Sequence, residues 1–295
     1  MSILKQFAKI VPWKRHHERA PHKPLLILYA LGRWAGGDRG DIPFSDVNRD
    51  LAQLLKEFGP SRRSQHPEYP FWRLQRDGVW TVRAPENMRQ RESNSDPLKS
   101  ELLTHHARAC FSDDVKAALN ADPKLAGRIA ACILQKHFPE TIHPDILSAV
   151  GLHLGIAVTA SKKRDPHFRL KVLTAYEYRC AVCGFDIRLG TVSVALDAAH
   201  IQWHQAGGPS KESNGLALCV LHHKIFDLGA FTLSPEGLLL VSDQANGSAG
   251  FQETLLAHHG KKIRMPQRPE WAPHGTYIGW HGKEVFKGEA RHLAA

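Results

Sequence analysis

The chain has 295 residues, of which 42% are hydrophobic and 23% charged. These proportions are typical of a globular protein, and the length allows two domains that each bury a core. The formal net charge of +10 favours a polyanionic partner such as nucleic acid. No apolar run is long enough to span a membrane, and residues 1–14 lack the apolar core of a secretory signal. We therefore expect a cytoplasmic protein rather than a membrane-bound or secreted one.

The first half of the chain predicts a mainly helical domain. Residues 22–35 and 44–58 carry apolar side chains at helical spacing, and Ser45 is placed to cap the second of these helices. The segment 97–154 has a similar pattern and predicts three or four more helices, broken at prolines.

A small β-hairpin is predicted between these helical segments. Residues 71–75 and 79–82 are typical of two short strands, and Asp77-Gly78 between them favours a tight turn. The fold class we expect is therefore α+β, with a mainly helical first domain that contains one small hairpin.

A charged, polar stretch, TASKKRDP at residues 159–166, predicts a linker. It divides the chain into domains of residues 1–158 and 167–295. Further elements expected in the second domain are one helix and two strands, at residues 168–178, 230–234 and 238–241.

Two metal-binding half-sites lie in the second domain. The chain has five cysteines, an odd number that favours metal binding over disulfide bonds. Cys180 and Cys183 form a Cys-x-x-Cys pair, and Cys219 and His222 repeat that spacing. Two such pairs can wrap one Zn²⁺ in a closed tetrahedral Cys₃His site, which is typical of structural zinc. The 35 residues between the pairs exceed what a simple finger uses, so we expect folded structure inside the loop.

Three polar residues lie at characteristic separations within and after this loop. In LDAAHIQWHQAGGPSKESNGLALC and the following VLHHKIFDLGAFTL, His200, Asn214 and His223 are 14 and 9 residues apart. This pattern resembles the HNH nuclease family, whose ββα-metal fold is a strand, loop, strand and helix. Adjacent helix positions point about 100° apart, so His222 can bind zinc while His223 points into a separate active site.

The HNH resemblance implies a metal-dependent DNA endonuclease. It assigns His200 as the general base, a task that suits a neutral imidazole near pH 7. It assigns His223 as a ligand of a catalytic Mg²⁺ or Mn²⁺, and Asn214 as a residue that orients His200 or braces the loop. Many relatives carry a further metal ligand directly before the first histidine, where this chain has Ala199. Asp197, two residues earlier, shares the face of Ala199 if the strand is regular there, and is the alternative ligand.

The first domain resembles the sulfur-recognising domain of restriction endonucleases that cleave phosphorothioate-modified DNA. The segments PHKPLLILYALGR, LLKEFGP and PEYPFWRLQRDGVW carry the resemblance over residues 18–82. The order of the two domains also fits that family, the McrA-like type IV restriction enzymes.

This second resemblance implies a pocket for sulfur. A sulfur atom in place of a phosphate oxygen is larger and poorly hydrated, so an apolar concavity can accept it. Tyr69 and Pro70 are the candidates for lining this concavity. Cations would hold the remaining charge and contact the DNA backbone. The candidates for that task are Arg19, His22, Lys23, Arg73, Arg62 and Arg63.

Together these patterns predict a modification-dependent restriction endonuclease that acts on phosphorothioate-modified double-stranded DNA. A homodimer is expected, because cutting both strands takes two active sites. Two alternatives stay open at this point. One is an HNH restriction nuclease specific for methylated or unmodified DNA, and the other is a non-catalytic DNA-binding protein with a degenerate zinc fold.

Overall fold

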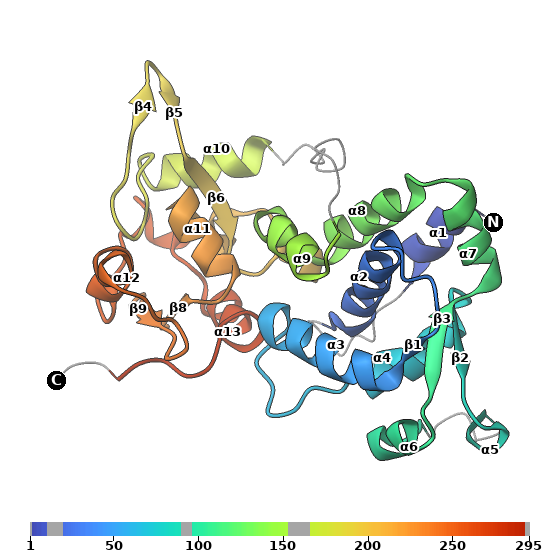
Figure 1. Ribbon diagram of the computed structural model, residues 1–295. Coiled ribbons are helices and arrows are strands. Elements are labelled where there is room, and N and C mark those ends of the chain that lie inside the picture. Colours follow the sequence, from blue (N-terminus) through green and yellow to red (C-terminus); the bar gives the residue numbers. More distant parts are fainter. Residues whose placement is uncertain (1, 11–19, 90–95, 153–165, 293–295) are drawn as a thin grey trace. The chain divides into compact units, whose positions relative to one another are not determined.

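The computed structural model describes residues 2–10, 20–89, 96–152 and 166–292, in two compact units that comprise residues 1–160 and 161–295 (Figure 1). Of the predicted linker, only Pro166 belongs to the described residues, and it begins a helix. The domain ranges expected from the sequence stay a prediction.

The first unit is mainly helical. Its helices and short 3₁₀ turns are α1 (Ile3–Lys9), α2 (His22–Ala35), α3 (Phe44–Phe58), α4 (Glu68–Arg73), η1 (Leu74–Asp77), α5 (Glu86–Arg89), α6 (Lys99–Thr104), α7 (Asp113–Ala121), α8 (Leu125–His137), η2 (Glu140–Ile142) and α9 (His143–Ala149). Three short strands form an antiparallel sheet in the order β1 (Ile42–Pro43), β3 (Arg108–Phe111), β2 (Trp80–Arg83). The predicted helices 22–35 and 44–58 are confirmed, but Pro43 precedes the second one and no side chain caps it, so the Ser45 cap is wrong.

Helix α2 forms the centre of the first unit. Ten of its residues are buried, and it packs against α3, α4 and α8. At Gly32 a Cβ atom would lie 1.8 Å from the carbonyl oxygen of Val150, so the chain beyond α9 approaches this helix too closely for any side chain. Burying apolar surface in such a core stabilises by about 25 cal/mol per Å².

Residues 71–75, predicted as a strand, are helical instead. Pro70, Phe71 and Leu74 are all buried, which is the spacing of one helix face rather than the alternation of a strand. Pro70 lies in the first turn of α4, where a missing N–H breaks no hydrogen bond of the helix.

The predicted hairpin is therefore wrong in its first strand and in its turn. Gly78 has a φ of 74° and ends η1 in the left-handed conformation, so Asp77-Gly78 marks the end of a helical turn. Strand β2 does form close to the predicted range 79–82. Its partner is β3, with Trp80 opposite Phe111, in a segment whose pattern predicted helix.

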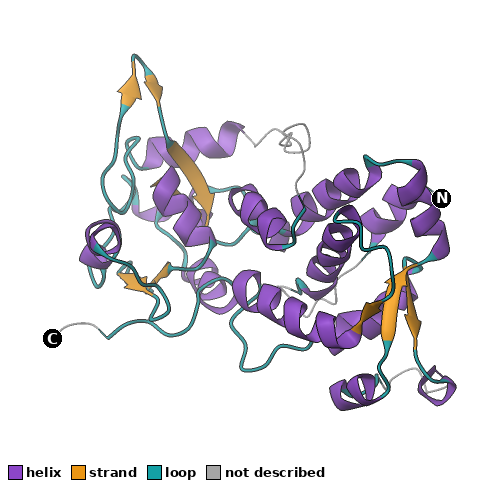
Figure 2. Cartoon of the chain, viewed as in Figure 1, coloured by secondary structure: helices purple, strands orange, loops and turns teal. Residues whose placement is uncertain are grey.

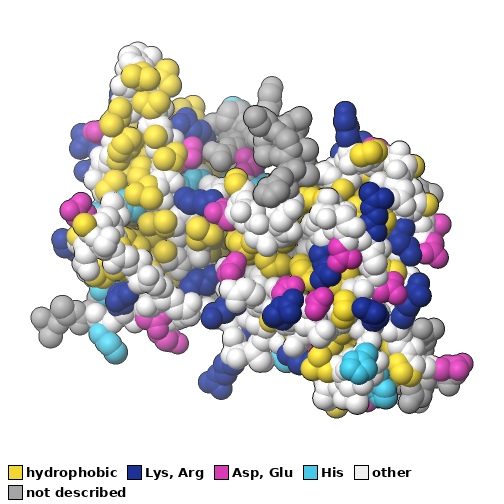
Figure 3. All heavy atoms as spheres, viewed as in Figure 1, with side chains coloured by type: hydrophobic (Ala, Val, Ile, Leu, Met, Phe, Trp, Pro, Cys, Tyr) yellow, Lys and Arg dark blue, Asp and Glu magenta, His cyan; other side chains and the backbone are white. Residues whose placement is uncertain are grey.

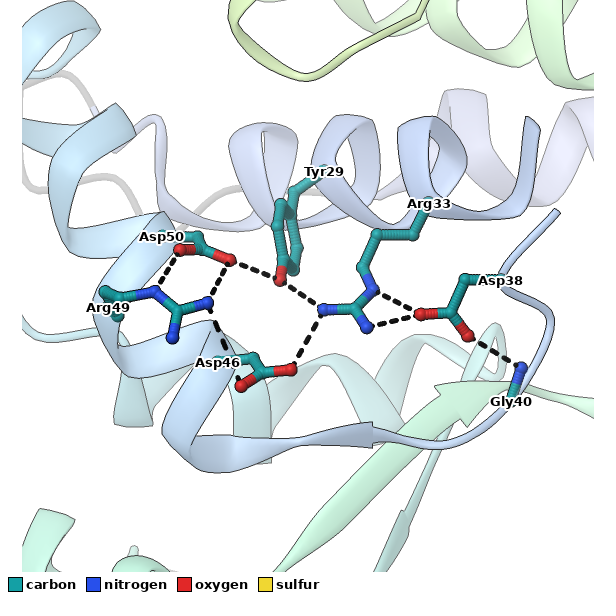
Figure 4. Close-up of polar contacts among 7 residues, drawn as sticks. All are labelled: Tyr29, Arg33, Asp38, Gly40, Asp46, Arg49 and Asp50. Carbon is teal, nitrogen blue, oxygen red and sulfur yellow. Dashed lines mark hydrogen bonds and ion pairs between the residues drawn. The ribbon is translucent and has the colours of Figure 1, made fainter. Parts of the chain in front are cut away.

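A polar network joins α2 to α3 (Figure 4). Arg33 Nη1 donates to Tyr29 Oη at 2.9 Å and to Asp46 at 3.1 Å, and Tyr29 Oη donates to Asp50 at 2.8 Å. Arg33 also pairs with Asp38 in the loop after α2. Burial raises the pKa of Tyr29 to about 12, so its hydroxyl stays a donor at neutral pH. The partly buried charges of the two helices thus satisfy one another.

The second unit is built from short elements. In chain order they are α10 (Pro166–Ala175), β4 (Arg188–Leu189), β5 (Val192–Ser193), β6 (Leu196–His200), η4 (His204–Ala206), η5 (Glu212–Asn214), β7 (Gly215–Cys219), α11 (Val220–Asp227), β8 (Phe231–Leu233), β9 (Leu239–Val241), α12 (Ala249–Thr254), η6 (Leu256–His258), η7 (Pro269–Trp271) and α13 (Gly275–Glu284). The helix predicted from residue 168 and the two strands predicted after residue 229 are confirmed.

Strands β6 and β7 and helix α11 form the ββα unit expected from the sequence (Figure 2). The strands pair antiparallel and in regular register, from Leu196 opposite Cys219 to His200 opposite Gly215. Helices α10 and α11 both pack on this pair. At Gly215 a Cβ atom would lie 2.4 Å from the Val172 side chain of α10, so glycine lets that helix lie against β7. The mixed helix and strand fold predicted from the sequence is confirmed.

The β4–β5 hairpin carries apolar side chains outside the core. Ile187, Leu189 and Val192 are 57%, 71% and 65% exposed, and Figure 3 shows hydrophobic side chains gathered along this hairpin. Elsewhere apolar residues are mostly buried. Across the described ranges, every helix is too short or too polar to cross a membrane.

Candidate active site and DNA-recognition surface

The three residues of the HNH pattern occupy three parts of the ββα unit. His200 is the last residue of β6, Asn214 immediately precedes β7, and His223 lies on α11. Asn214 is the last residue of η5 and lies one residue before β7.

His200 is half-buried, and its ring is held from two sides. The ring stacks on Phe168 of α10, with centroids 3.9 Å apart and an interplanar angle of 18°. Its Nε2 atom lies 3.2 Å from the hydroxyl of Ser210. A second imidazole, that of exposed His204, lies 5.9 Å away between centroids. A flat apolar contact and a hydrogen bond therefore both help to orient the ring.

Asn214 braces the loop between the two strands. Its side chain is fully buried; Oδ1 accepts from the backbone N–H of Gln202 at 2.8 Å, and Nδ2 donates to the carbonyl oxygens of Gln202 and Pro209 at 3.0 and 2.9 Å. At Gly208 a Cβ atom would lie 1.8 Å from the Gln202 oxygen and 2.9 Å from Asn214 Nδ2, so the loop also needs glycine there. The side-chain amide of Asn214 thus holds the loop that carries Ser210.

His223 lies between two carboxylates. Its Nδ1 is 3.4 Å from Asp197 Oδ2 and its Nε2 is 3.3 Å from Asp227 Oδ2. The regular β6–β7 register places Asp197 on the face that α11 covers. Burial lowers the pKa of His223, but Asp227 and Asp197 outweigh it and raise the pKa to about 9. The two carboxylates therefore concentrate negative charge around this ring.

Asp227 was missed in the sequence. It is 4% exposed, and besides facing His223 it accepts a hydrogen bond on Oδ1 from the indole N–H of Trp203 at 3.0 Å. The signal that was available is its position four residues after His223, because residues four apart share one face of a helix.

The donors around His223 fit a hard divalent cation. Carboxylate oxygens suit Mg²⁺ and Mn²⁺, and imidazole is a ligand of transition-metal ions. Asp197 and Asp227 face different nitrogens of the same ring. One nitrogen can therefore serve a cation while the other N–H donates to the remaining carboxylate, an arrangement typical of metal-binding histidines.

The four predicted zinc ligands come together in one cluster. One ligand atom from each of Cys180, Cys183, Cys219 and His222 lies within 4.8 Å of all the others. His222 directs Nδ1 at the cluster, 3.1 Å from Cys219 Sγ and 3.7 Å from Cys180 Sγ. A hydrogen bond from Cys219 lowers the pKa of the Cys180 thiol to about 3. The same bond raises the pKa of the Cys219 thiol, and burial raises that of Cys183, so Cys180 is the sulfur that takes the thiolate form that metals bind.

In the first unit, Tyr69 is one of the two residues predicted to line the sulfur pocket, and its side chain is 40% exposed. Its ring stacks on His66 with centroids 5.0 Å apart, and the Arg73 guanidinium lies 4.6 Å from its centroid. Pro70 is buried next to it. His66 was missed in the sequence, and so was buried Glu68, whose Oε1 lies 2.8 Å from His66 Nδ1.

The predicted cations differ in their surroundings. Lys23 pairs with Asp77 at 2.5 Å, whereas Arg62 and Arg63 are exposed. Burial, with the charges of His66 and Arg62, lowers the pKa of His22 to about 4, so His22 is a neutral ring at pH 7. Arg73 pairs with Asp96 at 2.5 Å. Arg19 lies outside the described residues.

The model of the ScoMcrA-like DNA sulfur-binding domain family matches residues 1–154, more than half of the chain. The chain belongs to this family. A second family model, that of the HNH endonucleases, matches residues 180–234, which include the cysteine cluster, β6, β7 and α11. This member of the sulfur-binding family therefore also carries an HNH endonuclease domain, as McrA-type restriction enzymes do, and it is a nuclease. Both resemblances expected from the sequence are confirmed.

Several solved structures are similar to part of this chain. The sulfur-binding domain of ScoMcrA complexed with phosphorothioated DNA is 24% identical, with a TM-score of 0.47 over 54% of this chain and 99% of that one. The type IV phosphorothioation-dependent restriction endonuclease ScoMcrA is 23% identical, with a TM-score of 0.45 over 52% of this chain and 29% of that one. With TM-scores below 0.5, these overlaps add nothing to the family match. No curated protein is significantly similar to the chain.

Proposed function

We propose that the chain is a modification-dependent restriction endonuclease, which recognises phosphorothioate-modified DNA through its first unit and hydrolyses phosphodiester bonds through its second. The observation that carries this proposal is the ββα arrangement of His200, Asn214 and His223 in a chain whose other half is a DNA sulfur-binding domain. A non-catalytic DNA-binding protein would not need His223 between two carboxylates beside such a motif.

His200 is the proposed general base. Its ring, held between Phe168 and Ser210, takes the proton of the attacking water. Asn214 keeps Ser210 in place by bracing the loop. His223 and one of its two neighbouring carboxylates, Asp197 or Asp227, would hold Mg²⁺ or Mn²⁺, while the other carboxylate accepts from the remaining ring N–H. A cation bound there would stabilise the charge that develops on the scissile phosphate.

Zinc is the ion that we assign to the cysteine cluster. Thiolate and imidazole donors suit Zn²⁺, and four protein ligands make a closed, structural site. His222 supports this assignment, because its second nitrogen lies 2.8 Å from the carbonyl oxygen of Thr254. Such a bond fixes which nitrogen is free for the metal.

Tyr69 is the proposed wall of the sulfur pocket, with Pro70 beside it. Stacking on His66 and the cation above its ring hold the tyrosine in place. Arg62 and Arg63, together with Arg19, Lys23 and Arg73, would contribute contacts to the DNA backbone. The neutral His22 would contribute a hydrogen bond rather than charge.

A cleavage assay separates this function from its alternatives. The substrates are one duplex in three forms, phosphorothioate-modified, cytosine-methylated and plain, each tested with Mg²⁺, with Mn²⁺ and with a chelator. We expect cleavage of the phosphorothioate duplex only when a divalent cation is present. Preferential cleavage of the methylated or plain duplex would replace the proposed specificity, and no cleavage of any duplex would remove the nuclease assignment.

We also propose a homodimer, because a double-strand cut takes two active sites. Analytical ultracentrifugation of the protein with and without the modified duplex tests this. A single chain on each duplex that still cuts both strands would contradict it.

A further inference from the structure

Trp203 lies in the loop between His200 and Asn214, and its side chain is buried rather than available to DNA. It is 2% exposed. Its indole N–H donates to Oδ1 of Asp227 at 3.0 Å, and the other oxygen of the same carboxylate lies 3.3 Å from Nε2 of His223. Asp227 therefore bridges the tryptophan and the histidine.

We propose that Trp203 is a positioning residue, which acts through Asp227 to set the ring of His223 for the divalent cation. This inference rests on the proposed nuclease function of the site. A buried carboxylate without donors is costly. An indole N–H can only donate, so it engages one oxygen of Asp227 and leaves the other directed at His223. In whichever role Asp227 serves, as ligand or as partner of the second nitrogen, the histidine ring depends on it.

Side chains of helix α13 pack against Trp203 and against α11. Trp280 of α13 packs edge-on against Trp203, with centroids 5.9 Å apart and an interplanar angle of 62°. The next residue, His281, stacks flat on Phe226 of α11 at 3.8 Å. Its Nε2 lies 3.2 Å from the Phe226 carbonyl oxygen, and its Nδ1 lies 2.9 Å from the Thr232 hydroxyl.

Helix α13 lies outside the 180–234 segment that matches the HNH family. The positioning chain that we infer therefore runs from Trp280 to Trp203, to Asp227 and to His223. It uses residues that the HNH pattern alone does not contain. If Trp203 only filled space in the core, a side chain of the same volume without the N–H could replace it with no loss of cation binding.

The test separates the effect of the Trp203 N–H donor from the effect of the volume of its side chain. Trp203→Phe keeps an aromatic ring but removes the N–H. A second variant replaces Trp203 by 3-benzothienylalanine, which has the bicyclic shape of indole and a sulfur atom in place of the N–H. The matched control is Trp271→Phe in the same unit, where the ring lies under the Arg268 guanidinium.

The readout is Mn²⁺ binding to the full chain with its zinc retained, measured by titration calorimetry, alongside melting temperature and zinc content. We expect the Kd for Mn²⁺ to rise about 10–100-fold in both Trp203 variants, with the control unchanged. Asp227→Asn should weaken Mn²⁺ binding to a similar extent. Because Trp203 acts through Asp227, adding Trp203→Phe to Asp227→Asn should then have little further effect.

Wild-type Mn²⁺ affinity in the benzothienylalanine variant would overturn the positioning role and leave the proposed nuclease intact. Additive losses in the double variant would also overturn it, because Trp203 would then act independently of Asp227. If the wild-type chain binds no Mn²⁺, the cation site and the positioning role both fail.

Discussion

His222 and Thr254 are joined by a contact of 2.8 Å between the imidazole Nε2 and the backbone carbonyl oxygen, across 32 residues of sequence. The contact leaves Nδ1 directed at Cys180 and Cys219. It also ties α12, which lies beyond the segment matched by the HNH family, to the cysteine cluster. The cysteine cluster is therefore supported by a backbone group of α12 as well as by its four ligands.

We expect one tightly bound Zn²⁺ per chain, and Cys183→Ser to lose it. Structural zinc contributes directly to folding free energy, so the variant should show a lower melting temperature in its second unit. Metal analysis and calorimetry measure both effects. Cys132→Ser is the matched control, since Cys132 lies in the first unit. Purified protein without zinc would contradict the assignment.

His200→Ala should abolish cleavage while leaving DNA binding nearly intact. Loss of a general base costs on the order of 10²–10⁴-fold in rate. Single-turnover cleavage and a binding titration on the same modified duplex measure the two effects separately. His204→Ala tests the neighbouring exposed ring and should stay within a few-fold of the wild type. If the two variants lose activity equally, the general base is not uniquely His200.

Tyr69→Ser should erase the preference for phosphorothioate DNA and leave weak, salt-sensitive binding. The preference rests on apolar contact with sulfur, whereas phosphate contacts release counterions and weaken steeply with salt. Binding is measured on a His200→Ala background, so that no substrate is cut. The parent protein should also prefer one stereoisomer at phosphorus, because a pocket meets only one non-bridging position.

Arg63→Ala is the comparison for Tyr69→Ser. Removing one backbone contact should weaken binding to modified and plain duplexes alike and lower the salt slope by about one. Equal affinity of the parent protein for both duplexes across a salt series would defeat the sulfur pocket, and the nuclease assignment would survive.

The first unit should lose stability as the pH falls from about 6.5 to about 4, in part through His22. The folded state holds the pKa of this ring near 4, below its usual 6.5, so the unfolded chain binds the extra proton within that range. Linkage then favours unfolding, by up to about 3 kcal/mol for this shift. Urea unfolding of wild type and His22→Gln at pH 7.5 and pH 5 measures it.

The variant should lose less stability than the wild type between those two pH values. His105→Gln, at an exposed position in the same unit, is the control and should follow the wild type. An identical pH dependence in His22→Gln and wild type would show that His22 does not contribute.

The sequence predicted those parts of the fold that depend on residues close together in the chain. Cysteine spacing indicated the cluster, and the helical periodicity of residues 22–35 and 44–58 indicated α2 and α3. The segment 71–75 was misassigned because an apolar, aromatic run of that length fits either a strand or a helix. Only its packing against α2 and α3 decides between them.

Contacts between distant residues could not be predicted from one sequence. The strand β3 depends on pairing with β2 and β1 rather than on its own periodicity. The bond from Trp203 to Asp227 spans 24 residues, and it exists only because the loop folds back over α11. The carboxylate could have been suspected from its place on the helix, but its donor could not.

The cysteine cluster closes a loop of chain that runs from Cys180 to His222. Asp197, His200 and Asn214 all lie inside that loop. An ion bound there therefore acts as a cross-link, which reduces the freedom of the unfolded chain as well as stabilising the folded one. Removing it would release the strand that carries both Asp197 and the general base, so loss of the structural ion should abolish cleavage although that ion takes no part in the reaction.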